Sequence, residues 1–266
     1  MLSVLTLNVQ AAALPRTQRL LAWLNARDDS LMILTETSNG PGTTHLLNQC
    51  RAAGLHVAHT PSPDGDRGCA IVSRVAAAAH ANLIGGVSLP GRAVTIGLST
   101  DPGVTVLGLY VPSSDRAPDK VAKKRTFLAS VLNGLRGLTD EQRAHLIVGG
   151  DYNVVSRDHQ PRYPGFLAFE YEFLDALHHL GLADVHQRLH PGVQAHSWIG
   201  MSGNGYRFDY LHTGAALAPL VVSCDYLHEP REQRLSDHAA VTAVLRLPVD
   251  RLPMADGPLA DASTLF

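Results

Sequence analysis

The chain has 266 residues, of which 45% are hydrophobic and 17% are charged, a composition that is ordinary for a folded globular protein. Its 22 Lys and Arg residues and 24 Asp and Glu residues give a formal net charge of −2, which excludes a generally basic nucleic-acid-binding protein. A local basic groove is not excluded, because the attraction of a charged ligand depends on where the charges lie.

Strands and helices alternate along the first half of the sequence. Alternating apolar and polar residues predict a strand over residues 2–9, and leucines at helical spacing predict a helix after Pro15. Residues 40–42 are expected to form a loop, and a Lys-rich helix is predicted over residues 119–135. The other predicted elements are strands at residues 30–34, 55–59, 68–75, 93–99 and 104–111, and a helix at residues 43–53.

The second half of the chain is richer in strands. They are predicted at residues 145–148, 196–199, 206–213, 220–226 and 239–245, with one amphipathic helix at residues 169–180. Many strands with interspersed helices indicate an α/β fold, which we expect to be a four-layer α/β/β/α sandwich of two packed mixed β-sheets flanked by helices. This domain is expected to span residues 1–247. Residues 248–266 lack periodicity and are expected to form a mobile tail.

Polar side chains occur at or near several of these strand ends, where a core would not require them. They are Asn8, Glu36, Tyr110, Asp151, Asn153, Asp209 and His238. Residues at strand ends can converge on one edge of a sheet, where binding sites form. Glu36 offers the hard oxygen ligand that Mg²⁺ prefers, and Asn8 and Asp237 could complete or orient such a metal site. Taken alone, Glu36 could also be a solvated acid.

Seven short patterns follow one another in a fixed order. They are residues 7–9 (Leu-Asn-Val), 34–37 (Leu-Thr-Glu-Thr), 68–74 (Gly-Cys-Ala-Ile-Val-Ser-Arg), 108–112 (Gly-Leu-Tyr-Val-Pro), 149–153 (Gly-Gly-Asp-Tyr-Asn), 207–210 (Arg-Phe-Asp-Tyr) and 236–238 (Ser-Asp-His). In these residues the chain resembles the endonuclease/exonuclease/phosphatase superfamily. The resemblance covers nearly the whole chain except the tail.

The resemblance implies a role for each polar residue in the hydrolysis of a phosphate ester. Asp151 would orient or deprotonate the attacking water, and Asn153 would hold a phosphate oxygen. Asp209 and His238 would form a hydrogen-bonded pair in which the imidazole acts as proton acceptor or as cationic stabiliser. Tyr110 would donate a hydrogen bond to the phosphate or to the leaving oxygen. The metal would be Mg²⁺, and Mn²⁺ could replace it.

Within the superfamily, the sequence resembles the exonuclease III-like apurinic/apyrimidinic (AP) endonuclease branch. The similar segments are residues 110–112 (Tyr-Val-Pro), 166–174, 181–185 and 196–198 (His-Ser-Trp). The resemblance aligns Trp198, Tyr206 and Phe208 with an apolar pocket for a base-less sugar, although ordinary strand packing would use the same aromatic residues. Three departures concern abasic-site preference: Ser113 replaces an Asn, Thr37-Ser38 follows the Glu where a Lys is usual, and the loop at residues 199–205 is short.

DNA contacts are expected from basic and polar residues near the same edge, including Arg74, Ser113 and Lys124. A Lys-rich helix can equally be only a solvated face. The last residues, Leu265 and Phe266, resemble the peptides by which bacterial repair proteins dock on the sliding clamp, or they are a frayed terminus.

The sequence therefore predicts a monomeric, cytoplasmic, nucleoid-associated and Mg²⁺-dependent DNA repair nuclease that cleaves 5′ to abasic sites, with further activity at 3′ ends. No stretch approaches the roughly 18 apolar residues of a membrane span, so no membrane partner is expected. One alternative is another phosphoesterase of the superfamily, either a non-specific nuclease or a phosphatase of small esters. A more distant alternative is a catalytically inactive DNA-binding module.

Overall fold

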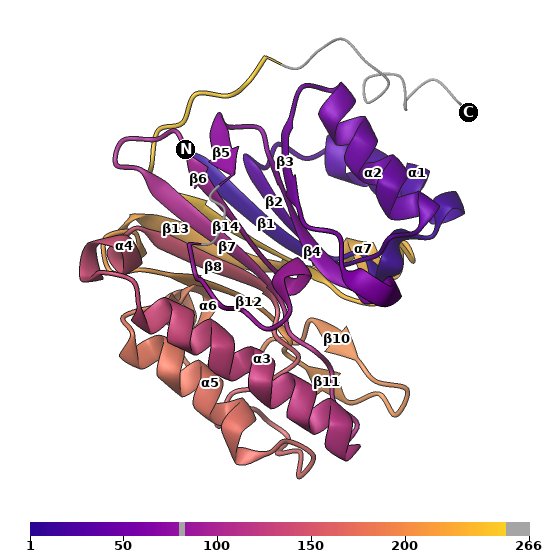
Figure 1. The fold of residues 1–266 in the computed structure, drawn as a ribbon, viewed down its shortest axis with the longest axis vertical. Coiled ribbons are helices and arrows are strands. Elements are labelled where there is room, and N and C mark those ends of the chain that lie inside the picture. Colours follow the sequence, from indigo (N-terminus) through magenta and orange to yellow (C-terminus); the bar gives the residue numbers. More distant parts are fainter. Residues whose placement is uncertain (80–82, 254–266) are drawn as a thin grey trace.

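Two six-stranded β-sheets lie face to face, and helices cover the outer face of each sheet (Figure 1). The computed structural model describes residues 1–79 and 83–253. The first sheet has the strand order β13-β14-β1-β2-β4-β3, and the second has the order β5-β6-β7-β8-β12-β9. Both sheets are mixed, because β1 pairs in parallel with β2 and β7 pairs in parallel with β8. The predicted four-layer α/β/β/α fold is confirmed.

The elements have the following bounds. The strands of the first sheet are β1 (Leu2–Asn8), β2 (Leu31–Thr37), β3 (His56–His59), β4 (Gly68–Ser73), β13 (Val221–Leu227) and β14 (Ala240–Leu245). Those of the second sheet are β5 (Ala77–Ala79), β6 (Ala93–Leu98), β7 (Val104–Tyr110), β8 (Leu146–Asp151), β9 (Ala183–Asp184) and β12 (Asp209–Thr213). A separate pair is formed by β10 (Trp198–Ile199) and β11 (Gly205–Tyr206). The helices are α1 (Leu14–Asn25), α2 (Pro41–Ala52), α3 (Pro118–Arg136), α4 (Asp140–Ala144), α5 (Ala168–His179), α6 (Val185–Leu189) and α7 (Glu229–Glu232).

Three apolar layers hold the four structural layers together. On β2, Ile33 faces the second sheet, whereas its neighbour Leu34 faces the helices α1 and α2. The strands of the second sheet alternate in the same way, with the helices α3 and α5 on their outer face. Since both faces of each central strand are buried, these strands are largely apolar. Their acidic and amide side chains stand at the strand ends, whereas Thr6 and His212 are buried polar residues inside β1 and β12.

The strand pairing brings those polar ends together. The parallel register places Asn8 beside Thr35, which precedes Glu36, in the first sheet. In the second sheet, Tyr110 and Asp209 both pair with Asp151. The two packed sheets therefore bring these residues to the same end of the sandwich.

The structure corrects two of the predicted elements. The expected loop at residues 40–42 contains the start of α2, because Pro41 occupies the first helical turn, where its missing N–H is not needed. The expected strand at residues 206–213 is broken, since Tyr206 pairs with β10 whereas Asp209 pairs with β8. The short elements β5, β9, α4, α6 and α7 were not expected from the sequence, because a few residues give too little periodicity to detect.

The chain continues beyond β14 along the first sheet. The amide of Leu252 donates to the carbonyl oxygen of Arg74 at 2.7 Å, and Arg251 forms a bridge pair with Val75. Residues 254–266, with Leu265 and Phe266, lie outside the described residues, so clamp docking stays a prediction. Among the described residues, no helix combines the length and apolar character that a membrane crossing needs.

Candidate active site

Asn8 connects two acidic residues at the end of the sandwich. Its Nδ2 donates to Glu36 Oε2 at 3.1 Å and to Asp151 Oδ2 at 2.9 Å. Its Oδ1 accepts a hydrogen bond from the backbone amide of Gln10 at 2.8 Å. The amide oxygen is thus turned away from the two carboxylates. The arrangement fits the expectation that Asn8 orients the metal site, but not that it binds a metal through its own oxygen.

Glu36 is placed by an irregularity in β2. The register between β2 and β4 shifts between Thr35 and Thr37, and Glu36 has a left-handed backbone with φ 56°. Bulges of this kind re-aim a side chain beside a functional site. The Glu36 carboxylate is partly exposed, and its Oε1 lies 3.9 Å from Nε of Arg67. Glu36 is therefore the acid of this cluster that solvent or a ligand can reach.

Asp151 ends β8 directly after two glycines. Gly150 has φ 140°, and a Cβ atom there would lie 1.9 Å from the carbonyl oxygen of Leu109, so only glycine fits. Asp151 is buried, and its Oδ1 accepts the amide of Asn153 at 2.9 Å. Burial, reinforced by the charge of Asp209, raises the pKa of Asp151 to about 7. In the absence of metal, this carboxyl therefore exchanges a proton near neutral pH, and its ionised form can accept one.

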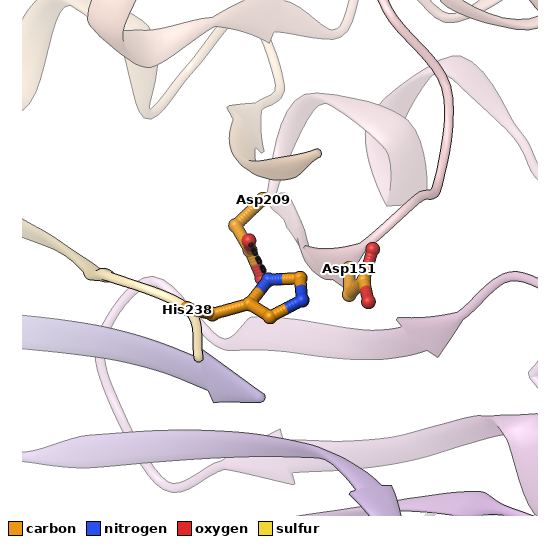
Figure 2. Close-up of side chains that lie close together, drawn as sticks. All are labelled: Asp151, Asp209 and His238. Atoms are coloured by element: carbon orange, nitrogen blue, oxygen red, sulfur yellow. Dashed lines mark hydrogen bonds and ion pairs between the residues drawn. The ribbon is translucent and has the colours of Figure 1, made fainter. Parts of the chain in front are cut away.

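Asp209 and His238 form a buried pair. Nδ1 of His238 lies 2.7 Å from Oδ2 of Asp209. Figure 2 shows the imidazole between the carboxylates of Asp209 and Asp151, and one candidate ligand atom from each of the three residues lies within 4.8 Å of the others. Burial opposes a charge on His238, but Asp209, helped by Asp151, outweighs it and raises the pKa of His238 to about 9. The metal-free pair thus carries an imidazolium at neutral pH.

Tyr110 and Asn153 lie beside the same acids. The guanidinium of Arg92 stacks 4.5 Å from the centre of the Tyr110 ring. Burial, together with the negative charges of Asp151 and Glu36, raises the pKa of the Tyr110 hydroxyl far above its ordinary value, so it remains a hydrogen-bond donor. The side chain of Asn153 is fixed by a 3.0 Å hydrogen bond from Nδ2 to the carbonyl of Val111.

Two residues predicted to contact DNA are not placed to do so. The side chain of Lys124 is only 1% exposed, and its ammonium is bound by Glu170 and by the carbonyl of Asn153 at 2.7 Å. Arg74 is buried, and it donates to the carbonyl of Arg27 at 2.6 Å. It follows β4 at the end of the first sheet opposite to Glu36, since Ser73 pairs with Leu31. Both predictions are therefore corrected.

The two remaining polar candidates are exposed. Asp237 precedes His238, and its Oδ2 accepts a hydrogen bond from Nε1 of Trp198 at 3.1 Å. Asp237 is therefore oriented by an aromatic residue and is not part of the cluster of Asp151, Asp209 and His238. Ser113 lies in the loop after β7.

An aromatic cluster adjoins the Asp209–His238 pair. The rings of Tyr206 and Phe208 stack at 5.2 Å, and Trp198 lies 5.5 Å from Tyr206, so the structure brings the three predicted aromatic residues together. A bridge pair joins Trp198 to His238. Sequence reasoning missed Tyr163, which stacks on Tyr206 at 4.2 Å, and Phe166, which meets Phe208 edge-on. Aromatic residues in a loop that also contains Pro161, Pro164 and Gly165 were the available signal.

The donor set fits a divalent cation. Glu36 and Asp151 supply carboxylate oxygens linked by Asn8, which are the hard ligands that Mg²⁺ prefers. Oδ1 of Asp209 is buried and has no hydrogen-bond partner within the described part of the chain. A buried carboxylate oxygen without a partner is costly unless a cation or a proton compensates for it.

Comparison with known proteins gives one family and several similar folds. The model of the Endonuclease/Exonuclease/phosphatase family matches residues 5–238. An AP endonuclease from Archaeoglobus fulgidus is 21% identical with a TM-score of 0.74, over 92% of this chain and 100% of that one. A 3′ phosphatase from Neisseria, solved with a product DNA hairpin, is 23% identical with a TM-score of 0.73. The match covers 92% of this chain and 99% of that one. An AP endonuclease from Leishmania major is 21% identical with a TM-score of 0.71, over 93% and 88%. No curated protein matches the sequence significantly.

Proposed function

The chain belongs to the endonuclease/exonuclease/phosphatase family, and from this membership and the geometry of its candidate active site we propose that it is a Mg²⁺-dependent DNA repair nuclease. It would hydrolyse the phosphodiester 5′ to an abasic site and leave a 3′-hydroxyl, and the same centre could act on 3′ ends as an exonuclease or a phosphatase. The main support is one observation. Asn8 from the first sheet bonds to Asp151 of the second, directly beside the Asp209–His238 pair.

Each residue has a proposed part in this reaction. Glu36, which is partly exposed, would hold a divalent cation, with Asp237 as a further proposed ligand, and the bound ion would neutralise charge on the phosphate. Asp151 takes a proton from the water that attacks phosphorus, the bond from phosphorus to the 3′-oxygen breaks, and the released 3′-oxygen takes up a proton from solvent to become the 3′-hydroxyl. The imidazolium of His238 and the side-chain amide of Asn153 stabilise the phosphate oxygens. Tyr110 donates a hydrogen bond to the phosphate or to the leaving oxygen.

DNA would lie across the exposed cations beside Glu36. Arg67 is 42% exposed next to the Glu36 carboxylate, and Lys123 on α3 is equally exposed beside Asp66. Ser113 lies in an exposed loop after Tyr110 and is a further proposed contact. Contacts of Lys and Arg with phosphates make affinity fall as salt rises.

The test is a panel of four substrates: an abasic duplex, an undamaged duplex, single-stranded DNA and a small phosphomonoester, each with Mg²⁺ and with EDTA. We expect Mg²⁺-dependent cleavage of the abasic duplex above all others. Equal cleavage of undamaged DNA would favour a general nuclease, and turnover of the monoester alone would favour a small-ester phosphatase. DNA binding without any turnover would favour an inactive binding module and would overturn the proposal.

The aromatic cluster gives a separate prediction about substrate choice. Replacing Trp198 with Ala removes one wall of the proposed sugar pocket, so we expect cleavage of the abasic duplex to fall about 10-fold or more. Cleavage of undamaged DNA should change much less. Trp198→Phe, which keeps a ring but loses the hydrogen bond to Asp237, serves as a conservative variant, and Trp23→Ala on α1 controls for loss of a tryptophan elsewhere. Equal losses on both substrates would assign Trp198 to packing.

A further inference from the structure

An unusual turn follows Asn8. Three consecutive non-glycine residues, Gln10, Ala11 and Ala12, have left-handed φ values of 48°, 60° and 41°. This conformation is unfavourable for residues that carry a Cβ atom, and it persists only where the surroundings hold it. The turn lies between β1, which carries Asn8, and the start of α1.

The guanidinium of Arg16, in the first turn of α1, holds this turn. Its Nη2 donates to the carbonyl oxygens of Val9 at 3.1 Å and of Gln10 at 2.5 Å. Its Nη1 donates to Oε1 of Gln10 at 2.6 Å. A planar guanidinium suits this task, because its donors reach several acceptors at fixed angles.

The conformation of this turn also fixes the side chain of Asn8. The amide of Gln10 donates to Oδ1 of Asn8, and this bond directs Nδ2 toward Glu36 and Asp151. If the turn relaxed to an ordinary backbone conformation, the Gln10 amide would change direction. Asn8 would then lose the bond that sets its orientation.

Arg16 also reaches the loop that carries His238. Its Nη1 donates to the carbonyl of Leu235 at 2.8 Å. The next residue, Ser236, donates from its hydroxyl to the carbonyl of Asn8 at 2.6 Å and accepts the amide of His238 at 3.0 Å. One cation therefore joins two segments that lie more than 200 positions apart in the chain, and each segment carries a residue of the candidate active site.

We propose that Arg16 is a positioning residue that keeps the left-handed turn at residues 10–12 in place and thereby sets Asn8 against Glu36 and Asp151. The proposal assigns Arg16 no contact with the substrate, because the hydrogen bonds of its guanidinium go to backbone carbonyls and to Oε1 of Gln10. The expected effect of Arg16 on kcat rests on the proposed phosphoesterase function. The expected effect of Arg16 on the position of Asn8 does not.

The kinetic test compares Arg16→Ala with Arg19→Ala. Arg19 is the matched control, because it lies about one helical turn after Arg16 on α1. Arg19 also donates to a backbone carbonyl near Leu235, that of Gln233, but this hydrogen bond does not involve the left-handed segment at residues 10–12. We expect kcat of R16A to fall about 10-fold to 100-fold, since displacement of a catalytic group by about 1 Å costs that much, with KM changing less than about 3-fold. R19A should stay within about 2-fold of wild type.

A second variant tests whether Arg16 acts through the turn. Glycine adopts a left-handed φ without penalty, so Ala11→Gly in the R16A background should recover a large part of the lost kcat. The assays are run well below the unfolding temperature of each variant, which separates kcat from loss of folded protein. A kcat that does not recover, with R16A/A11G as stable as R16A, would contradict action through the turn.

A crystal structure of R16A completes the test without any assay of activity. We expect Asn8 to lose its hydrogen bond to Gln10 and at least one of its bonds to the two carboxylates. If Asn8 keeps all three bonds, the inference is overturned. If wild-type protein hydrolyses no phosphate ester, the proposed function fails, while the position of Asn8 in R16A still decides this inference.

Discussion

Replacing Asp151 with Asn is expected to lower kcat by about 10³-fold on whichever phosphate ester the protein hydrolyses, because a general base or water-orienting group contributes a factor of this order. The substitution keeps the shape of the side chain. It also keeps an oxygen that can accept from the Asn153 amide. It removes the ability to accept a proton, the negative charge beside Asp209, and the oxygen Oδ2 that accepts the hydrogen bond from Nδ2 of Asn8.

Above about pH 7 the same substitution removes the cost of a buried charge, and this gain is opposed by the lost hydrogen bond from Asn8, so we expect only a small change in stability. The pKa of Asp151 is raised to about 7, so between about pH 4 and pH 7 the folded protein keeps a proton that the unfolded chain has lost. Stability contributed by this group therefore falls as the pH rises through that window, and the neutral Asn avoids the loss. A large loss of activity with little change in stability is typical of a functional residue and not of a packing residue.

The measurements are kcat with saturating Mg²⁺ and the midpoint of thermal unfolding at pH 8 in EDTA. Asp225→Asn is the control, because this exposed acid lies on β13 outside the cluster of Asp151, Asp209 and His238. D225N should match wild type in both measurements. A D151N variant that retains more than about a tenth of wild-type kcat would contradict the proposed role, since a general base should account for more than that.

Four of the predicted site residues lie at the strand ends where the sequence pattern put them. Asn8, Glu36, Tyr110 and Asp151 each stand at the end of a nearly apolar strand, and the pairing of parallel strands leaves such ends on the same side of a sheet. Strand pattern and local motif therefore located them without knowledge of the tertiary structure. The four-layer fold was expected, but the contact between Asn8 and Asp151 that its packed sheets make was found only in the structure.

The errors arose where a side chain's direction decides its role. Lys124 lies at helical spacing from Leu128, Val131 and Leu135, so it is on the buried face of α3, and the apolar pattern of that helix could have shown this. Its charge suggested DNA, but its position on the helix implied a buried ion pair with Glu170. The turn at residues 10–12 could not have been predicted, because Gln-Ala-Ala has no residue that favours a left-handed backbone.

The Asp209–His238 pair gives the second prediction of a large effect. We expect His238→Ala to lower kcat by about 10³-fold and Asp209→Asn by about 10²-fold, because the first removes the group that meets the phosphate and the second removes only its partner. The double variant should be no slower than H238A alone, since Asp209 acts through the imidazole. Losses that multiply would show that Asp209 acts independently, for example on a cation. His145→Ala, at the C-terminus of α4, is the control for loss of a histidine.

The pKa of His238 supplies a second readout of the same pair, measured by NMR on the imidazole in EDTA. In wild type we expect a value of about 9, since Asp209 outweighs burial, and in D209N a clearly lower value, because burial then acts with less opposition. A raised pKa means that the pair's contribution to stability is complete below the ordinary value of about 6.5 and is lost as the pH rises through about 9. Metal-free wild type should therefore lose stability across that window by more than D209N does. An unchanged pKa in D209N would mean that the 2.7 Å contact between Nδ1 and Oδ2 does not hold the proton on the ring. A wild-type pKa at or below the ordinary value of about 6.5 would reject the cationic role proposed for His238.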